Sequence, residues 1–189
     1  MKKIVSVFAL IILGCSLIAQ TPPEPASKIM DDAYKLAAKE GKQVMIIFHA
    51  SWCGWCKKLD ASMADSTCKE FFEKNFIVRH LDIMEQGDKK VLENKGAAEL
   101  FKKYGGEGSG VPYFLIFDPK GALLADSKYV SANSVGDIKG INIGCPASDE
   151  EVAAFVQILK KTTKITDSQV TAVTERFIKN QSKKVIKVI

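Results

Sequence analysis

Hydrophobic and polar residues occur along this chain in blocks that predict alternating helices and strands. Apolar residues at helical spacing predict a helix over 28–40, with Ser27 as its N-cap. The uninterrupted apolar run 44–48 predicts a strand that is buried on both faces. A broken helical pattern over 53–74 and a second strand over 76–83 follow. Because a helix connects them, the two strands are expected to lie parallel in one sheet.

The second half of the chain combines a helical stretch, a hairpin, a long polar segment and two closing helices. Residues 85–103 have a helical pattern, with a break expected at Gly96. The core residues expected there are Val91, Leu92, Leu100 and Phe101. Strands over 113–117 and 122–125 flank the turn signature Asp118-Pro119-Lys120-Gly121. The polar segment 127–147 has no regular pattern, and the capping boxes Ser148/Glu151 and Thr166/Gln169 then predict the two helices.

These elements predict an α/β fold with a central mixed sheet flanked by helices. We expect an N-terminal helix before the first strand, a long insertion before the helix that begins near residue 149, and an extra C-terminal helix. The expected organisation is a linker over 20–27, one domain over 28–181 and an apolar tail over 182–189.

Residues 1–19 have the pattern of a secretory signal peptide. Lys2 and Lys3 precede an apolar run that fades by Ala19 and is short for a membrane-spanning helix, which needs about 20 apolar residues. Two processing sites compete: cleavage after Ala19, and lipidation at Cys15, where Ile12-Leu13-Gly14-Cys15 resembles a bacterial lipobox. Either one predicts a periplasmic or secreted protein, and a membrane is a partner only if Cys15 is lipidated.

Composition narrows the possible functions. The chain has 189 residues, 47% of them hydrophobic, which argues against intrinsic disorder. The net charge of +5 falls by two, to +3, once Lys2 and Lys3 leave with the leader. Because no dense Lys/Arg face with interleaved aromatic residues is present, we expect no nucleic-acid partner.

Cys53 and Cys56 are the residues from which we expect chemistry. They stand in Trp52-Cys53-Gly54-Trp55-Cys56, where a buried strand is followed by a helix. In the first turn of a helix, free N–H groups and the positive end of the helix dipole favour thiolate, so Cys53 is expected to be the nucleophile. Cys56, three residues later on the same helix face, is expected to be the resolving thiol. The motif therefore predicts thiol–disulfide exchange through a mixed disulfide.

Other interpretations of the two cysteines are weaker. A zinc site would need a second cysteine pair or a Cys/His cluster, whereas Cys68 and Cys145 stand alone. Covalent haem would need His after the second cysteine, where Lys57 stands. A purely structural disulfide within one helical turn would stabilise little, because it closes a very short loop. We therefore expect neither a metal nor a cofactor.

Residues 44–58 and 110–121 together resemble the thioredoxin-like superfamily. The resemblance rests on the strand 44–48, the segment Ala50-Ser51-Trp52-Cys53-Gly54-Trp55-Cys56-Lys57-Lys58, the segment Gly110-Val111-Pro112, and the hairpin that follows it. The match is similar to extracytoplasmic bacterial members with an N-terminal helix. It implies a thioredoxin-like fold in which Pro112 is cis and faces the disulfide, while the backbone of Val111 pairs with substrate peptide. It also implies an exchange reaction on protein or peptide disulfides.

This chain departs from the thioredoxin pattern around the motif. Trp55 replaces the proline common in thioredoxins, so their redox potential cannot be transferred. Ile47 occupies the position of their buried acid and cannot carry a proton, which leaves His49 as a candidate proton carrier or a structural histidine. His80 is expected to pack on the second strand. Trp52 and Trp55 are expected either to form an apolar rim for substrate or to pack, and Lys57 is a possible auxiliary residue.

The segment 127–147 is expected to emerge beside Cys53, because the preceding hairpin starts and ends at that side of the sheet. An irregular connection of this length predicts a lid or a substrate platform, with a surface loop as the alternative. Cys145 is then a candidate for exchange with the active pair. Cys68 is expected to be a small buried residue away from the site, without a bridge to Cys145.

Together these observations predict a protein-disulfide oxidoreductase of exported proteins, with reduction favoured by the family resemblance. Two alternatives stay open: a disulfide oxidase or isomerase, and a non-catalytic thioredoxin-fold binding module tethered to a membrane. The expected partners are protein or peptide disulfide substrates and a redox partner that recycles the cysteine pair.

Overall fold

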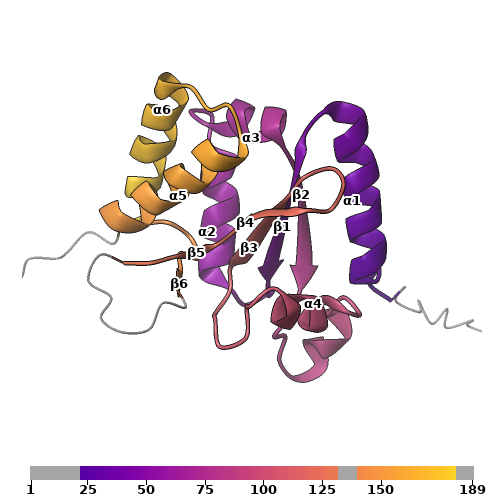
Figure 1. Ribbon diagram of the computed structural model, residues 1–189. Coiled ribbons are helices and arrows are strands. Elements are labelled where there is room, and N and C mark those ends of the chain that lie inside the picture. Colours follow the sequence, from indigo (N-terminus) through magenta and orange to yellow (C-terminus); the bar gives the residue numbers. More distant parts are fainter. Residues whose placement is uncertain (1–21, 132–139, 182–189) are drawn as a thin grey trace, which may run out of the picture.

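The computed structural model describes residues 22–131 and 140–181. The predicted signal peptide, the tail over 182–189 and part of the long polar segment lie outside the described residues. The described residues form an α/β fold in which a four-stranded mixed sheet lies between two layers of helices (Figure 1). The predicted fold class is therefore confirmed.

The sheet has the strand order β2-β1-β3-β4. The strands are β1 (Gln43–His49), β2 (Phe76–Asp82), β3 (Tyr113–Phe117) and β4 (Leu123–Asp126). As predicted, β2 is parallel to β1, while β3 is antiparallel to both β1 and β4. In the parallel pair His49 lies opposite Asp82 and Ile47 lies opposite His80. This register brings together polar residues that are distant in sequence.

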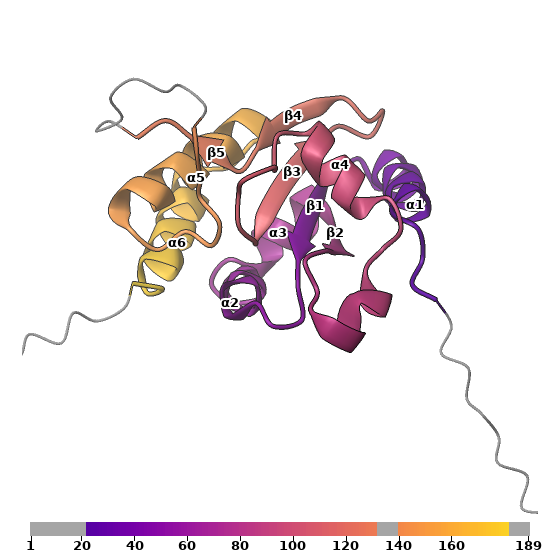
Figure 2. The ribbon, with the colours of Figure 1, turned by 90° about the horizontal axis from the view of Figure 1, so that it is seen from below.

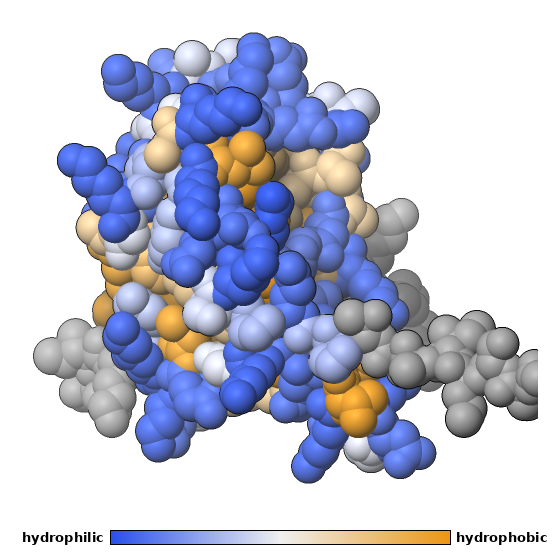
Figure 3. Space-filling model, turned by 90° about the vertical axis from the view of Figure 1, so that its right-hand side faces the viewer, coloured by the Kyte–Doolittle hydropathy of each residue, from blue (hydrophilic) through white to orange (hydrophobic). Residues whose placement is uncertain are grey.

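Helices cover both faces of the sheet, as Figure 2 shows from below. One face is covered by α1 (Ala26–Glu40) and α4 (Ala97–Lys103). The other is covered by α2 (Gly54–Met63), α3 (Lys69–Asn75), α5 (Asp149–Thr162) and α6 (Asp167–Ile178). Alternate residues of β1 enter the two cores, because successive side chains of a strand point to opposite faces. The outer face of the α1 layer is mostly hydrophilic (Figure 3).

Several helix ends agree with the sequence, and one does not. Ser148 and Thr166 form the two predicted capping boxes at the starts of α5 and α6. The break predicted within the helical pattern over 53–74 separates α2 from α3. However, α1 begins at Ala26 after the N-cap Pro25, so Ser27 lies inside the helix and does not cap it. Proline fits this helix start because it lacks the N–H group that would be left unpaired.

The expected helix over 85–103 is wrong in its first half. A short 3-10 helix, η1 (Gly87–Leu92), precedes Gly96, and only α4 behind it is α-helical. Val91 and Leu92 are exposed rather than in the core, whereas Phe101 is buried as expected. The sequence has apolar residues at helical spacing here, but in the part of the chain that the structure describes no helix or strand covers Val91 and Leu92.

The segment 127–147 contains more structure than its composition indicates. A two-stranded sheet joins β5 (Lys128–Tyr129) to β6 (Ile141–Asn142). The Ser127 hydroxyl donates to the Asn142 side chain at 2.7 Å, and Ile143 N–H donates to Ser127 O at 2.7 Å. Ser127 Oγ also accepts from Phe114 N–H of β3 at 3.2 Å, so the return of the segment is held beside β3.

Candidate active site

The cysteine motif lies at the junction of β1 and α2. The chain leaves β1 at His49 and turns, with Cys53 N–H donating to Ala50 O at 3.0 Å. Cys53 is the N-cap of α2, one residue before the first helical turn in which it was expected. Its Sγ is bonded to Cys56 Sγ and accepts a hydrogen bond from Cys56 N–H at 3.0 Å. The predicted pairing of Cys53 with Cys56 is present.

The helix terminus determines how the two sulfurs differ. At the N-cap, Cys53 Sγ faces the free N–H groups of α2, which stabilise negative charge there when the bond is reduced. Cys56 lies inside the helix, and both residues are almost fully buried, with Cys53 only 3% exposed. The arrangement favours Cys53 as the thiolate that meets a substrate and Cys56 as the sulfur behind it.

A cavity opens beside the disulfide on the side of Pro112. The Val111-Pro112 peptide bond is cis, as the resemblance implied, and Val111 O lies 3.5 Å from Cys53 Sγ. The cavity has a volume of about 220 Å³ and combines residues from α2, the cis-proline turn and the segment that precedes α5. Its lining is Trp55, Val111, Pro112, Ile143, Gly144, Cys145, Ala147 and Glu151. The end of the long polar segment therefore does lie beside the active pair.

The two tryptophans of the motif are both exposed. Trp52 donates from Nε1 to Met84 O at 2.8 Å, which fixes its ring beside the loop after β2. The ring of Trp55 lies 4.3 Å from Lys58 Nζ, at cation–π distance. Exposed aromatic rings on two sides of a buried disulfide can contact a partner that approaches the sulfurs. Lys57 is exposed and forms no side-chain hydrogen bond or ion pair with a described residue.

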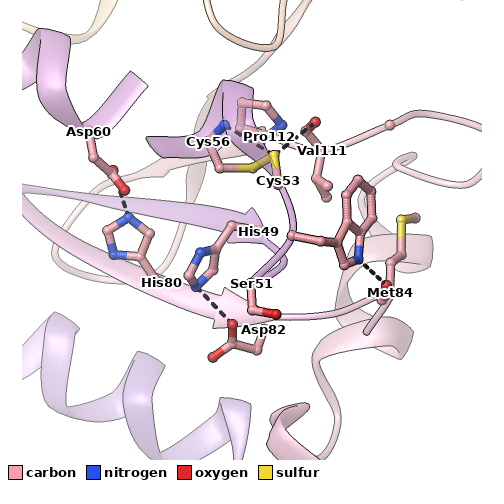
Figure 4. Close-up of a disulfide and its surroundings, with 12 residues drawn as sticks. His49, Ser51, Cys53, Cys56, Asp60, His80, Asp82, Met84, Val111 and Pro112 are labelled. Carbon is pink, nitrogen blue, oxygen red and sulfur yellow. Dashed lines mark hydrogen bonds and ion pairs between the residues drawn. A yellow bond between two sulfur atoms is a disulfide. The ribbon is translucent and has the colours of Figure 1, made fainter. Parts of the chain in front are cut away.

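His49 belongs to a polar cluster under the disulfide (Figure 4). Its Nε2 lies 3.0 Å from Asp82 Oδ1, and its ring lies 4.8 Å from the ring of His80. His80 Nε2 in turn lies 2.9 Å from Asp60 Oδ1. Burial lowers the pKa of the His49 imidazole, against the attraction of the Asp82 carboxylate, and burial raises the pKa of Asp82. His49 is therefore neutral near pH 7, with Nδ1 as its proton acceptor if Nε2–H donates to Asp82.

The remaining cysteines are free and buried. Burial raises the pKa of the Cys145 thiol to about 12, and burial also raises the pKa of Cys68. Both stay protonated at neutral pH, and a protonated thiol is a poor nucleophile. Cys68 Sγ lies 3.1 Å from Ser62 O and is the small buried residue that the sequence predicted. Cys145 lines the cavity beside Pro112 in its thiol form.

Asn180 is a structural residue of the site that sequence reasoning missed. This buried side chain donates to Pro146 O at 3.1 Å and to Ser62 Oγ at 3.0 Å. Its backbone carbonyl accepts from Lys58 Nζ at 3.2 Å. Asn180 thus ties the end of α6 to α2 and to the wall of the cavity. An isolated Asn after a helix carries no sequence signal for such a role.

In residues 22–131 and 140–181 no three His, Cys, Asp or Glu side chains are grouped as a metal site would need. None of the helices there has both the length and the apolar character to span a bilayer.

Comparisons with known proteins agree with the architecture. Residues 26–119 match the family model described as thioredoxin-like. Over 85 residues the chain is 30% identical to a protein disulfide-isomerase of Hordeum vulgare. That alignment covers 44% of this chain and only 17% of the barley protein.

Solved structures with similar folds share little sequence with this chain. A disulphide isomerase from Xylella fastidiosa is 21% identical, with 62% of this chain and 80% of that one covered and a TM-score of 0.44. The DsbH oxidoreductase is 20% identical, with 85% of this chain and 96% of that one covered and a TM-score of 0.43.

Proposed function

Because residues 26–119 belong to the thioredoxin-like family, we propose that this protein is a thiol–disulfide oxidoreductase that exchanges disulfides with exported proteins. The observation that carries the proposal is the Cys53–Cys56 disulfide at the N-terminus of α2, with Val111 O 3.5 Å from the leading sulfur. The family includes disulfide isomerases and oxidoreductases with such a cysteine pair. Reduction of the substrate is the favoured direction.

The reaction follows from the positions of the two sulfurs. The Cys53 thiolate attacks one sulfur of a substrate disulfide, forming a mixed disulfide, and the released substrate thiolate takes up a proton. Cys56 then loses its proton and attacks Cys53 Sγ, which re-forms the Cys53–Cys56 bond and releases the second substrate thiolate. Two electrons pass from the pair to the substrate, and a separate dithiol partner must reduce the pair for another cycle.

Export is part of the proposal, and its support is the leader sequence. The leader over 1–19 would direct the domain to an oxidising compartment, and it would be removed after Ala19 or leave a lipid anchor on Cys15. The N-terminal mass of the exported protein distinguishes cleavage after Ala19 from lipidation at Cys15.

The proposed direction is tested by equilibrium with glutathione and by turnover. If the protein is a reductase, the reduction potential of its Cys53–Cys56 pair should lie near that of thioredoxin, about −270 mV. The protein should then also accelerate the reduction of insulin by dithiothreitol. A potential nearer −120 mV would assign an oxidase instead. Absence of both an exchangeable Cys53–Cys56 bond and insulin reduction would contradict the proposal as a whole.

His49 is the group that we propose takes the proton from Cys56. Its neutral imidazole lies under the disulfide, and its Nε2 contact with Asp82 leaves Nδ1 free to accept. General base catalysis contributes typically 10²-fold or more, so His49→Gln should slow resolution of the mixed disulfide about 100-fold at pH 7. Above about pH 8.5, where an ordinary thiol ionises without a base, the difference in resolution rate between His49→Gln and the wild type should narrow.

In the wild type the rate of mixed-disulfide resolution should fall at acid pH, because the lowered pKa of His49 keeps its imidazole neutral near pH 7. Resolution should be fast near neutrality and should fall only at a pH below about 6.5, where the imidazole becomes protonated. Stopped-flow measurement of mixed-disulfide decay from pH 5 to 9 tests this. His80→Gln is the matched control, because it removes the neighbouring ring and leaves His49 and Asp82 in place. Superimposable profiles for His49→Gln and the wild type would exclude the role.

A further inference from the structure

Asn142 of β6 forms hydrogen bonds with the backbone on both sides of Val111. Its Nδ2 donates to Gly110 O and to Pro112 O, each at 3.0 Å. The carbonyl between them, Val111 O, lies 3.5 Å from Cys53 Sγ, and Figure 4 shows it directed at that sulfur. Of three successive carbonyl groups, the first and the third are therefore bonded to one amide, while the second faces the nucleophile.

The rest of the Asn142 amide is bonded to the long polar segment. Its Oδ1 accepts from the Ser127 hydroxyl at 2.7 Å and from Gly144 N–H at 3.1 Å. The orientation of the amide is determined, because Gly144 N–H can only donate and the two carbonyl groups of the cis-proline turn can only accept. All four hydrogen-bonding positions of the side chain are thus occupied, and it cannot rotate without breaking several of these bonds.

Asn142 connects the two walls of the cavity beside the disulfide, although it is not among the residues that line the cavity. One wall is formed by Val111 and Pro112, and the other includes residues 143–145. The amide is bonded to Pro112 O of the first wall and to Gly144 N–H of the second. The separation of the walls and the direction of Val111 O relative to the sulfur are therefore set by the same side chain.

We infer that Asn142 is a positioning residue for disulfide exchange, which holds the cavity at a fixed width for the substrate and keeps Val111 O facing Cys53 Sγ. The inference rests on the proposed function and assigns a residue of the long polar segment to it. Because Cys53 is only 3% exposed, a substrate sulfur reaches it while the rest of the substrate lies against the cavity. Walls that are already in place need no ordering when the substrate binds, whereas walls that are free to move do. Loss of Asn142 should therefore weaken substrate binding more than it slows the chemical step.

Two substitutions separate the bonds to the cis-proline turn from the bonds to the long polar segment. Asn142→Asp keeps the shape of the side chain and an oxygen that can accept from Ser127 and Gly144, but it places a carboxylate oxygen instead of an N–H donor against the two carbonyl groups. Asn142→Ala removes all four bonds. Ile141→Ser is the matched control, because Ile141 precedes Asn142 in β6 and its side chain is 52% exposed.

The test measures steady-state reduction of insulin and, in the reduced protein, alkylation of Cys53. In both Asn142 variants kcat/KM for insulin should fall about fivefold or more, mainly through KM, because hydrogen bonds that shape the binding site are lost. At about pH 9, where the thiol is ionised, the rate at which iodoacetamide alkylates Cys53 should stay within about twofold of the wild-type rate, because the start of α2 is unchanged. Ile141→Ser should match the wild type in both measurements. Melting curves identify a temperature at which the proteins are folded, and if Asn142→Ala does not fold, Asn142→Asp decides.

The outcomes separate this inference from the proposed function. An unchanged KM for insulin in both Asn142 variants would refute the positioning role and leave the oxidoreductase in place. A loss confined to Asn142→Ala would also refute it, because only the attachment of the long polar segment would then matter. A parallel fall in the alkylation rate would refute it too, since the substitutions would then act on Cys53 itself. If the wild type neither reduces insulin nor exchanges its Cys53–Cys56 bond, the proposed function fails.

Discussion

Replacing Cys53 by Ser is expected to reduce disulfide exchange to the uncatalysed background, a fall of about 10³-fold or more. The serine hydroxyl is not ionised at neutral pH, so the N–H groups at the start of α2 would have no thiolate to stabilise. Cys56, inside the helix and almost fully buried, cannot replace it as the first nucleophile. Reduction of insulin by dithiothreitol measures the effect, and activity that survives Cys53→Ser would contradict the assignment of the nucleophile.

Cys56→Ser provides the matched comparison, because it alters the other sulfur of the same bond. Cys53 remains able to attack, but no second thiol is available to displace the substrate. Stable mixed disulfides between Cys53 and the substrate should therefore accumulate and be visible on non-reducing gels. Accumulation of the same adducts in Cys53→Ser, or their absence from Cys56→Ser, would contradict the assignment of Cys53 as nucleophile and Cys56 as resolving thiol.

Replacing Phe155 by Ala is expected to lower the free energy of unfolding by about 3–5 kcal/mol. Phe155 is 1% exposed and lies at the centre of the core that joins α5 to the sheet. Its ring centroid is 5.1 Å from that of Phe177 on α6, and 5.6 Å from that of Phe114 on β3. Alanine would leave a cavity bounded by three elements, which cannot close without moving a helix.

Denaturant unfolding measures this loss, and two further variants show where it comes from. Phe155→Leu keeps most of the buried volume and should lose clearly less stability than Phe155→Ala. Leu123→Ala removes an exposed side chain and should change the free energy of unfolding by no more than about 0.5 kcal/mol. A loss below about 1 kcal/mol in Phe155→Ala would mean that α5 is not held through this core.

Features that depend on neighbouring residues in the chain were predictable. The apolar run of β1, the capping boxes at Ser148 and Thr166 and the hairpin before β4 all appear in the structure. Each of these signals acts over a few residues, through alternation of side chains, a local hydrogen bond or a turn. The pairing of Cys53 with Cys56 belongs to the same class, since both lie within one helical turn.

Two features that depend on contacts between distant segments were not predicted. Val91 and Leu92 have the spacing of a buried helix face, but no layer of the fold covers that face. The Asn180 side chain bonds with Ser62, 118 residues away in the chain.

The sequence by itself determined the class of the fold, the order of its elements and the cysteine pair, because these follow from local periodicity, capping and spacing. Segment 127–147 was expected beside Cys53, but only the tertiary structure decided which of its side chains, and which polar residues, surround the pair. The parallel register of β1 and β2 places His49 beside Asp82, and the return of the chain at residues 143–145 places a cavity wall beside Pro112. The physical reason is that such contacts join segments whose separation in the chain bears no relation to their distance in the folded protein.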